Sequence, residues 1–169
     1  MDAKRESEPS PMKNRTTVEQ RSERELVVTR TFDAPARLVF EAWTKPELLK
    51  RWWVPKSSGM TMLSCETDVR VGGTYRFVFR LPGAPEPMAF FGRYLEVVPG
   101  ARLVWTNEEA GEGGPVTTAT FEEKAGKTVV AVSELHASKE SLEAARTSGA
   151  EAGASEAYEQ LDELLVTQR

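Results

Sequence analysis

The 169-residue sequence has little of the chemistry from which disulfides, metal sites and nucleic-acid interfaces are built. It contains one cysteine and one histidine, so an internal disulfide is excluded and the usual Cys/His zinc sites cannot form. Its 22 basic and 26 acidic residues give a net charge of −4. This argues against nucleic acid as a partner, because nucleic-acid-binding surfaces are usually basic. We therefore expect no metal and no other cofactor.

Long apolar segments are also missing. There is no run of about 18 apolar residues, so no membrane span is expected, and the N-terminal residues lack the apolar stretch of a secretory signal. Residues 1–24 contain six Lys or Arg, five Asp or Glu and no aromatic residue, which is too little apolar surface to offset the entropy of ordering them. We expect a disordered polar tail over residues 1–24, one folded domain over residues 25–169 and a cytoplasmic location.

Short runs of β-branched and aromatic residues recur with turn signals between them, as is typical of antiparallel strands. The first strand is expected over residues 25–32. Six more are expected over 60–70, 75–80, 89–98, 102–108, 116–123 and 128–135, with turns at Gly72-Gly73 and Pro99-Gly100. Because no helical pattern interrupts these six strands, they predict an antiparallel meander.

Helical patterns lie on either side of this meander. Two short helices are predicted after the first strand, where Asp33 and Pro35 suit a helix start and Thr44 and Glu47 have capping-box spacing. A longer amphipathic helix is predicted near the C-terminus, with its apolar face toward the sheet. That face is formed by Ala157, Tyr158, Leu161, Leu164 and Leu165. The fold class is therefore α+β, with a sheet of six or seven strands curled around the long C-terminal helix.

Side chains suited to proton transfer are few. His136 is the sole histidine, and no spacing around it resembles a nucleophile motif, so we interpret it as a polar residue facing water at a strand end. Glu66, Glu96 and Glu134 lie in expected strands, where a buried carboxylate would have a raised pKa and could act as acid or base. Strand carboxylates usually face solvent, and around Glu96 the pattern leaves the inner face open. Cys65 is interpreted as a small core residue.

Aromatic residues, in contrast, are concentrated. All 14 follow residue 24, and 11 of them fall between residues 40 and 105. Such side chains usually fill a core, but a sheet curled around a helix can also leave a pocket that suits an apolar or aromatic ligand. The sequence leaves both interpretations open. The candidate ligand-binding residues are Trp53, Met60, Met62, Tyr75, Phe77, Phe79, Tyr94, Trp105 and Tyr158.

A series of short motifs resembles one known family. The motifs are Phe32-Asp33-Ala34-Pro35, Trp43-Thr44-Lys45-Pro46-Glu47, Trp52-Trp53, Asp68-Val69-Arg70-Val71-Gly72-Gly73, Gly92-Arg93-Tyr94-Leu95-Glu96-Val97-Val98-Pro99 and Arg102-Leu103-Val104-Trp105-Thr106. In this order, over about residues 25–168, they are similar to the START-like (SRPBCC) superfamily, in the branch that resembles the C-terminal domain of heat-shock-protein-90 ATPase activator homologues. The resemblance implies the helix-grip fold, with a cavity for hydrophobic small molecules between a curved sheet and the C-terminal helix. Val54-Pro55 and Gly59-Met60 depart from the Gly-Pro and Gly-Phe that are common in the family, which leaves the ligand open.

Three functions are consistent with these features. The first is a non-enzymatic module that binds an apolar or aromatic molecule, lipid-like or polyketide-like. The second, implied by the resemblance, is an interaction module that acts in the stress response as a chaperone partner or forms a homodimer. The third is a cyclase, hydrolase or dehydratase that uses one of the four acid–base candidates, with Tyr94 or Arg76 orienting the substrate. Binding is preferred over catalysis because the sequence contains no recognisable catalytic motif.

Overall fold

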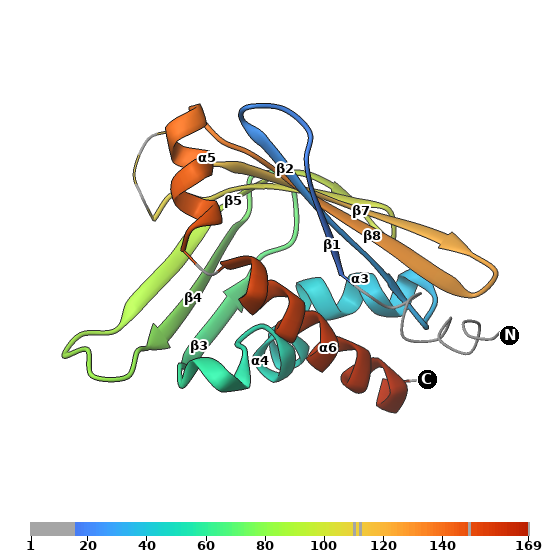
Figure 1. Cartoon of the computed structure of the whole chain (residues 1–169). Helices are drawn as coiled ribbons and strands as arrows, with labels where there is room; N and C mark the ends of the chain where they lie inside the picture. Colours follow the sequence, from blue (N-terminus) through green and yellow to red (C-terminus); the bar gives the residue numbers. More distant parts are fainter. Residues whose placement is uncertain (1–15, 110, 112, 149, 169) are drawn as a thin grey trace, which may run out of the picture.

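The computed structural model describes residues 16–109, 111, 113–148 and 150–168, and within them one eight-stranded antiparallel sheet forms the main layer (Figure 1). The strand order across the sheet is β1-β2-β8-β7-β6-β5-β4-β3, so strands β3 to β8 form the expected meander and β2 pairs with β8. The strands are β1 (Thr17–Gln20), β2 (Glu25–Phe32), β3 (Thr61–Thr67), β4 (Thr74–Arg80), β5 (Met88–Val98), β6 (Arg102–Thr106), β7 (Val116–Lys124) and β8 (Lys127–Leu135).

Helices cover one side of this sheet. The described residues form α3 (Ala36–Thr44), α4 (Pro46–Trp52), α5 (Lys139–Arg146) and α6 (Ala150–Gln168), with a 3-10 turn, η1 (Lys56–Ser58), after α4. Figure 1 shows α6 running beside α3 and α4 below the sheet. Tyr158 on α6 contacts the rings of Phe32, Trp43 and Trp52, so the apolar face of α6 packs on the helix pair as well as on the sheet. None of the helices in the described ranges is long and apolar enough to cross a membrane.

This arrangement confirms the predicted α+β helix-grip fold. The curved sheet, the helix pair after β2 and the long C-terminal helix all occur in the expected order. The five apolar residues expected on one face of the C-terminal helix are all buried, because their spacing of three and four residues places them on one stripe of α6.

Strand β1 corrects the expected start of the folded region. Thr17 pairs with Thr29 and Gln20 pairs with Leu26, although residues 17–20 belong to the segment 1–24 that was expected to be a disordered tail. The order of this segment comes from main-chain hydrogen bonds to β2, which composition does not reveal. The rest of the predicted tail, residues 1–15, lies outside the described residues.

The helix starts also differ from the expected capping. The N-cap residues are Pro35 and Lys45, and neither makes a side-chain cap. The backbone N–H of Ala36 instead donates to Oε1 of Glu123 on β7 at 2.9 Å. The Thr44 hydroxyl donates to the backbone carbonyl of Phe40 at 3.0 Å. The first helix is thus anchored to the sheet by a carboxylate that is distant in sequence.

A β-bulge determines which side chains of β5 face inward. The pairing of β5 with β6 shifts between Tyr94 and Glu96, and the extra residue interrupts the alternation of the strand. Tyr94 is buried, whereas Leu95 and Glu96 are both exposed. Glu96 Oε1 accepts a hydrogen bond from Arg102 Nε at 3.0 Å. The face that the sequence left open around Glu96 is therefore the outer face.

Candidate functional site

A cavity lies between the inner face of strands β4 to β6 and the helix pair. Its volume is about 40 Å³ when counted as the space open to the centre of a water molecule, and about 410 Å³ of space free of protein atoms lies within it and its mouth. One water molecule needs about 10–15 Å³ of the first kind of space, so the enclosed part of the cavity has room for about three waters. The lining residues are Trp43, Trp53, Tyr75, Phe77, Phe90, Tyr94, Leu103, Trp105 and Asn107.

Strand alternation places most of these side chains. Tyr75 and Phe77 are buried on β4, whereas Arg76 between them is exposed, as expected for a strand with one face on the core. On β5 the inward positions are Phe90, Gly92 and Tyr94. A Cβ at Gly92 would lie 2.1 Å from the backbone oxygen of Thr106. Glycine at this position therefore allows β5 and β6 to approach closely beside the cavity.

The aromatic rings form a continuous wall. The ring centroids of Trp53 and Phe77 lie 5.4 Å apart, those of Tyr75 and Phe77 lie 5.3 Å apart, and those of Tyr75 and Tyr94 lie 5.8 Å apart. The Trp53–Phe77 pair meets edge to face at 73°, and the other two pairs are tilted at 52° and 53°; all three centroid distances are in the range of favourable aromatic contacts. Each ring thus restrains its neighbour, and the wall is organised without a ligand.

Two of the polar lining residues, Tyr75 and Asn107, are bonded to the protein itself. The Tyr75 hydroxyl donates to the backbone carbonyl of Thr106 at 2.7 Å and lies 3.4 Å from Asn107 Oδ1. Asn107 Nδ2 donates to the Pro115 carbonyl and to Thr117 Oγ1, both at 2.9 Å. In contrast, the Tyr94 hydroxyl has no hydrogen bond to any residue that the structure describes.

The cavity is electrically neutral. None of its lining residues carries a charged side chain. Burial raises the pKa of both Tyr75 and Tyr94 far above the ordinary value for tyrosine, so both are neutral phenols at physiological pH. A charged ligand would find no counter-charge in this wall and would lose its hydration on entry.

The structure places five of the nine predicted ligand-binding residues in the cavity wall. These are Trp53, Tyr75, Phe77, Tyr94 and Trp105. The other four lie elsewhere. Phe79 is fully buried and packs on Phe90 at 5.1 Å, Tyr158 packs among Phe32, Trp43 and Trp52, and neither Met60 nor Met62 lines the cavity.

Four lining residues are absent from the sequence-based set. Phe90 and Leu103 share the strand alternation of the predicted residues Tyr94 and Trp105, so period two on β5 and β6 could have identified them. Trp43 lies on α3, where its periodicity indicates only a buried helix face. Asn107 follows the end of β6, and no sequence signal distinguishes it.

Two of the acid–base candidates are on the wrong face for cavity chemistry. Glu66 pairs with Arg76 across β3 and β4, and both side chains are exposed on the outer face of the sheet. Glu96 also faces outward, because of the bulge in β5. The hypothesis that Glu66 or Glu96 acts as acid or base in the cavity, with Arg76 orienting the substrate, is therefore wrong.

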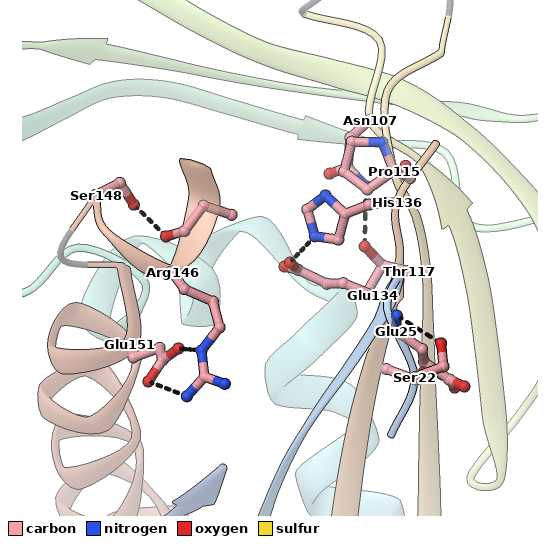
Figure 2. A network of polar contacts seen from close by, with 12 residues as sticks. Ser22, Glu25, Asn107, Pro115, Thr117, Glu134, His136, Arg146, Ser148 and Glu151 are labelled. Atoms are coloured by element: carbon pink, nitrogen blue, oxygen red, sulfur yellow. Dashed lines mark hydrogen bonds and ion pairs between the residues drawn. The ribbon is translucent and has the colours of Figure 1, made fainter. Parts of the chain in front are cut away.

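Glu134 and His136 form a pair at the end of β8 (Figure 2). His136 is only 5% exposed, and its Nε2 lies 3.2 Å from Glu134 Oε1, so the interpretation of His136 as a residue facing water is wrong. Glu134 is opposite Thr117 in the β7–β8 ladder, and Thr117 contacts the cavity residue Asn107. Neither Glu134 nor His136 lines the cavity itself.

The Cys65 thiol and possible metal-binding clusters are the remaining candidates for reactive chemistry. Cys65 is 7% exposed and belongs to the hydrophobic core, as predicted. Burial raises the pKa of its thiol to about 11, which keeps it protonated and unreactive. Within the described part of the chain, no group of three or more His, Cys, Asp or Glu side chains is placed to hold a metal ion.

Comparisons with known proteins agree with this fold. No curated protein is significantly similar to the chain. Among solved structures, a Nitrosomonas europaea protein is 26% identical, with a TM-score of 0.78 over 87% of this chain and 97% of that one. A Rhodobacter sphaeroides protein is 25% identical, with a TM-score of 0.83 over 91% and 99%. The family model for activator of Hsp90 ATPase homolog 1-like protein matches residues 33–166. The chain therefore belongs to the activator of Hsp90 ATPase homolog 1-like family, within the START-like (SRPBCC) superfamily.

Proposed function

We propose that this protein binds a small, neutral aromatic molecule in the cavity between β4–β6 and the helix pair. The observation that carries this proposal is the composition of the wall: seven of the nine lining residues are aromatic, one is leucine and one is asparagine. Protein interiors are normally packed to the density of organic crystals. A space that this wall leaves unfilled is one where an aromatic ring gains contacts on every side.

The size of the cavity limits which ligands it can hold. The enclosed space of about 40 Å³ is smaller than the roughly 150 Å³ of a cavity that holds benzene, so a single ring would also occupy the mouth of the cavity. A lipid chain or a fused polyketide would require a larger movement of the wall. Single-ring aromatic compounds are therefore the first ligands to test.

The position of the acid–base groups favours binding over catalysis. Glu66 and Glu96 face away from the cavity, and neither Glu134 nor His136 lines it. A general acid or base must lie within hydrogen-bond reach of the proton that it transfers. The aromatic and neutral wall is suited to holding a molecule rather than to transforming it.

The tryptophans provide a direct test with a built-in control. Trp43, Trp53 and Trp105 line the cavity, whereas Trp52 is 1% exposed and its Nε1–H donates to the Ala42 carbonyl at 2.9 Å. In a ¹H–¹⁵N NMR titration with toluene, we expect the indole N–H signals of the three lining tryptophans to move and to saturate, and that of Trp52 to move least. No movement, or equal movement of all four signals, would contradict the proposal.

A further inference from the structure

We propose that the Tyr94 hydroxyl is the group that determines ligand specificity in this cavity, selecting neutral aromatic molecules that carry a hydroxyl group over hydrocarbons of the same shape. This selectivity rests on the proposed ligand-binding function and adds the ligand chemistry to it. The relevant observation is that Tyr75 and Tyr94, two buried tyrosines of one wall, differ in the hydrogen bonding of their hydroxyls. Their ring centroids lie 5.8 Å apart.

Tyr94 is held in place by its backbone. Its N–H donates to the Gly73 carbonyl and its carbonyl accepts from the Gly72 N–H, both at 2.9 Å. Gly73 is itself held by its N–H, which donates to the Arg70 carbonyl at 2.8 Å, and only glycine fits here because a Cβ would lie 1.9 Å from the backbone oxygen of Asp68. The side chain is 4% exposed and packs against the Tyr75 ring. The hydroxyl is thus positioned before any ligand enters, which lowers the entropy cost of binding.

The Tyr94 hydroxyl lacks the protein partner that the Tyr75 hydroxyl has. Tyr75 donates to the Thr106 carbonyl at 2.7 Å, whereas Tyr94 makes no hydrogen bond within the described residues. The oxygen of Tyr94 is also not among the buried side-chain atoms of the described residues that are sealed from solvent without a hydrogen bond. A buried hydroxyl normally has a partner, so a molecule in the cavity is the natural partner for this one.

The chemistry of the remaining groups indicates which ligands benefit. The indole N–H groups of Trp43, Trp53 and Trp105 also have no hydrogen bond within the described residues, but an indole N–H can only donate. A tyrosine hydroxyl both donates and accepts. A ligand hydroxyl can therefore both donate to and accept from Tyr94, whereas the Tyr75 hydroxyl already donates its proton to the Thr106 carbonyl and Asn107 Nδ2 donates to Pro115 and Thr117.

The test compares two ligands and two matched variants. Toluene and p-cresol share a ring and a methyl group and differ by one hydroxyl. By calorimetric titration we expect Tyr94→Phe to reduce the preference for p-cresol over toluene roughly threefold to tenfold, the range for loss of one neutral hydrogen bond. Tyr158→Phe removes the hydroxyl of a buried tyrosine that does not line the cavity and should change this preference by less than about twofold.

The outcomes separate the two proposals. If neither ligand binds the unmodified protein, the proposed function fails. If both bind and Tyr94→Phe leaves the preference unchanged, or Tyr158→Phe reduces it equally, the role of Tyr94 is overturned. Should Tyr94→Phe not fold, the unmodified protein with ¹³C-labelled tyrosine answers the same question. The Tyr94 Cζ signal should then move much further with p-cresol than with toluene, and equal movement with both ligands would overturn the role.

Discussion

The side-chain amide of Gln160 on α6 donates to the backbone carbonyl of Val54 at 2.9 Å. The same amide donates to the Trp52 carbonyl at 3.1 Å and accepts from the Lys56 N–H at 2.9 Å. One side chain that is 9% exposed thus satisfies three backbone groups of the segment that carries Trp53. Through this contact the C-terminal helix holds one wall of the cavity in place.

Replacing this amide should weaken both the fold and the cavity. Gln160→Met keeps the size of the side chain but leaves buried backbone groups without partners, at a cost of about 1–3 kcal/mol in the free energy of unfolding. Toluene affinity should fall as well, because Trp53 loses its support. Urea unfolding and titration measure the two effects. Glu163→Met, at an exposed position of the same helix, is the control, and an equal effect there would contradict the role of Gln160.

The size limit of the cavity can be tested at Leu103, which is fully buried and lines the wall. Leu103→Ala should lower the free energy of unfolding by about 2–5 kcal/mol and should allow naphthalene, a two-ring compound, to bind. Leu49→Ala is the matched control, since Leu49 is equally buried but does not line the cavity. It should destabilise the protein without admitting naphthalene. Binding of naphthalene to the unmodified protein and to both variants alike would show that the cavity does not set the size limit.

The stability of the protein is expected to depend on pH through Glu156, whose carboxylate binds η1. Its carboxylate accepts from the Ser57 hydroxyl at 2.5 Å and from the Ser57 N–H at 2.9 Å, and these bonds lower the pKa of Glu156 below 4.5. A lowered folded-state pKa stabilises the protein fully above pH 4.5, and this contribution is lost as the pH falls through the folded-state value. Glu156→Gln should therefore lower the thermal midpoint at pH 7, and the difference from the unmodified protein should shrink with acidification. A difference that is constant with pH would contradict this assignment.

The ion pair of Arg30 and Asp162 joins β2 to α6 in a largely buried setting. Arg30 Nη2 lies 2.6 Å from Asp162 Oδ2, with side-chain exposures of 5% and 22%. Asp162→Leu leaves the arginine charge buried and should reduce the free energy of unfolding by about 3–5 kcal/mol. The double variant Arg30→Met/Asp162→Leu should recover most of this loss, because it removes both charges. Chemical denaturation measures these free energies. If the double variant loses as much stability as the two single variants together, the two residues do not depend on each other.

Much of the fold was predictable from the sequence, because strand alternation and the helical stripe of α6 are local patterns. The exceptions depend on contacts between distant segments. Strand β1 is ordered by its pairing with β2, the start of α3 is bonded to Glu123, and the bulge beside Glu96 is visible only in its pairing with β6. A pattern within one segment carries no signal for these three.

The site was less predictable than the fold. Alternation identifies which aromatic residues face inward, but it does not separate the cavity residue Phe77 from the packed core residue Phe79, which lies two positions further along the same strand. That difference depends on Phe90, which covers Phe79. Likewise, the different roles of the Tyr75 and Tyr94 hydroxyls depend on where the Thr106 carbonyl lies. Chaperone binding and self-association stay predictions.

A crystal structure of the protein soaked with toluene tests the central claim most directly, since it locates the ligand without reference to any variant. The account predicts one toluene ring in contact with Trp43, Phe77, Tyr94 and Trp105. A cavity that stays closed to toluene while the ligand occupies another surface, or no site at all, would contradict the account.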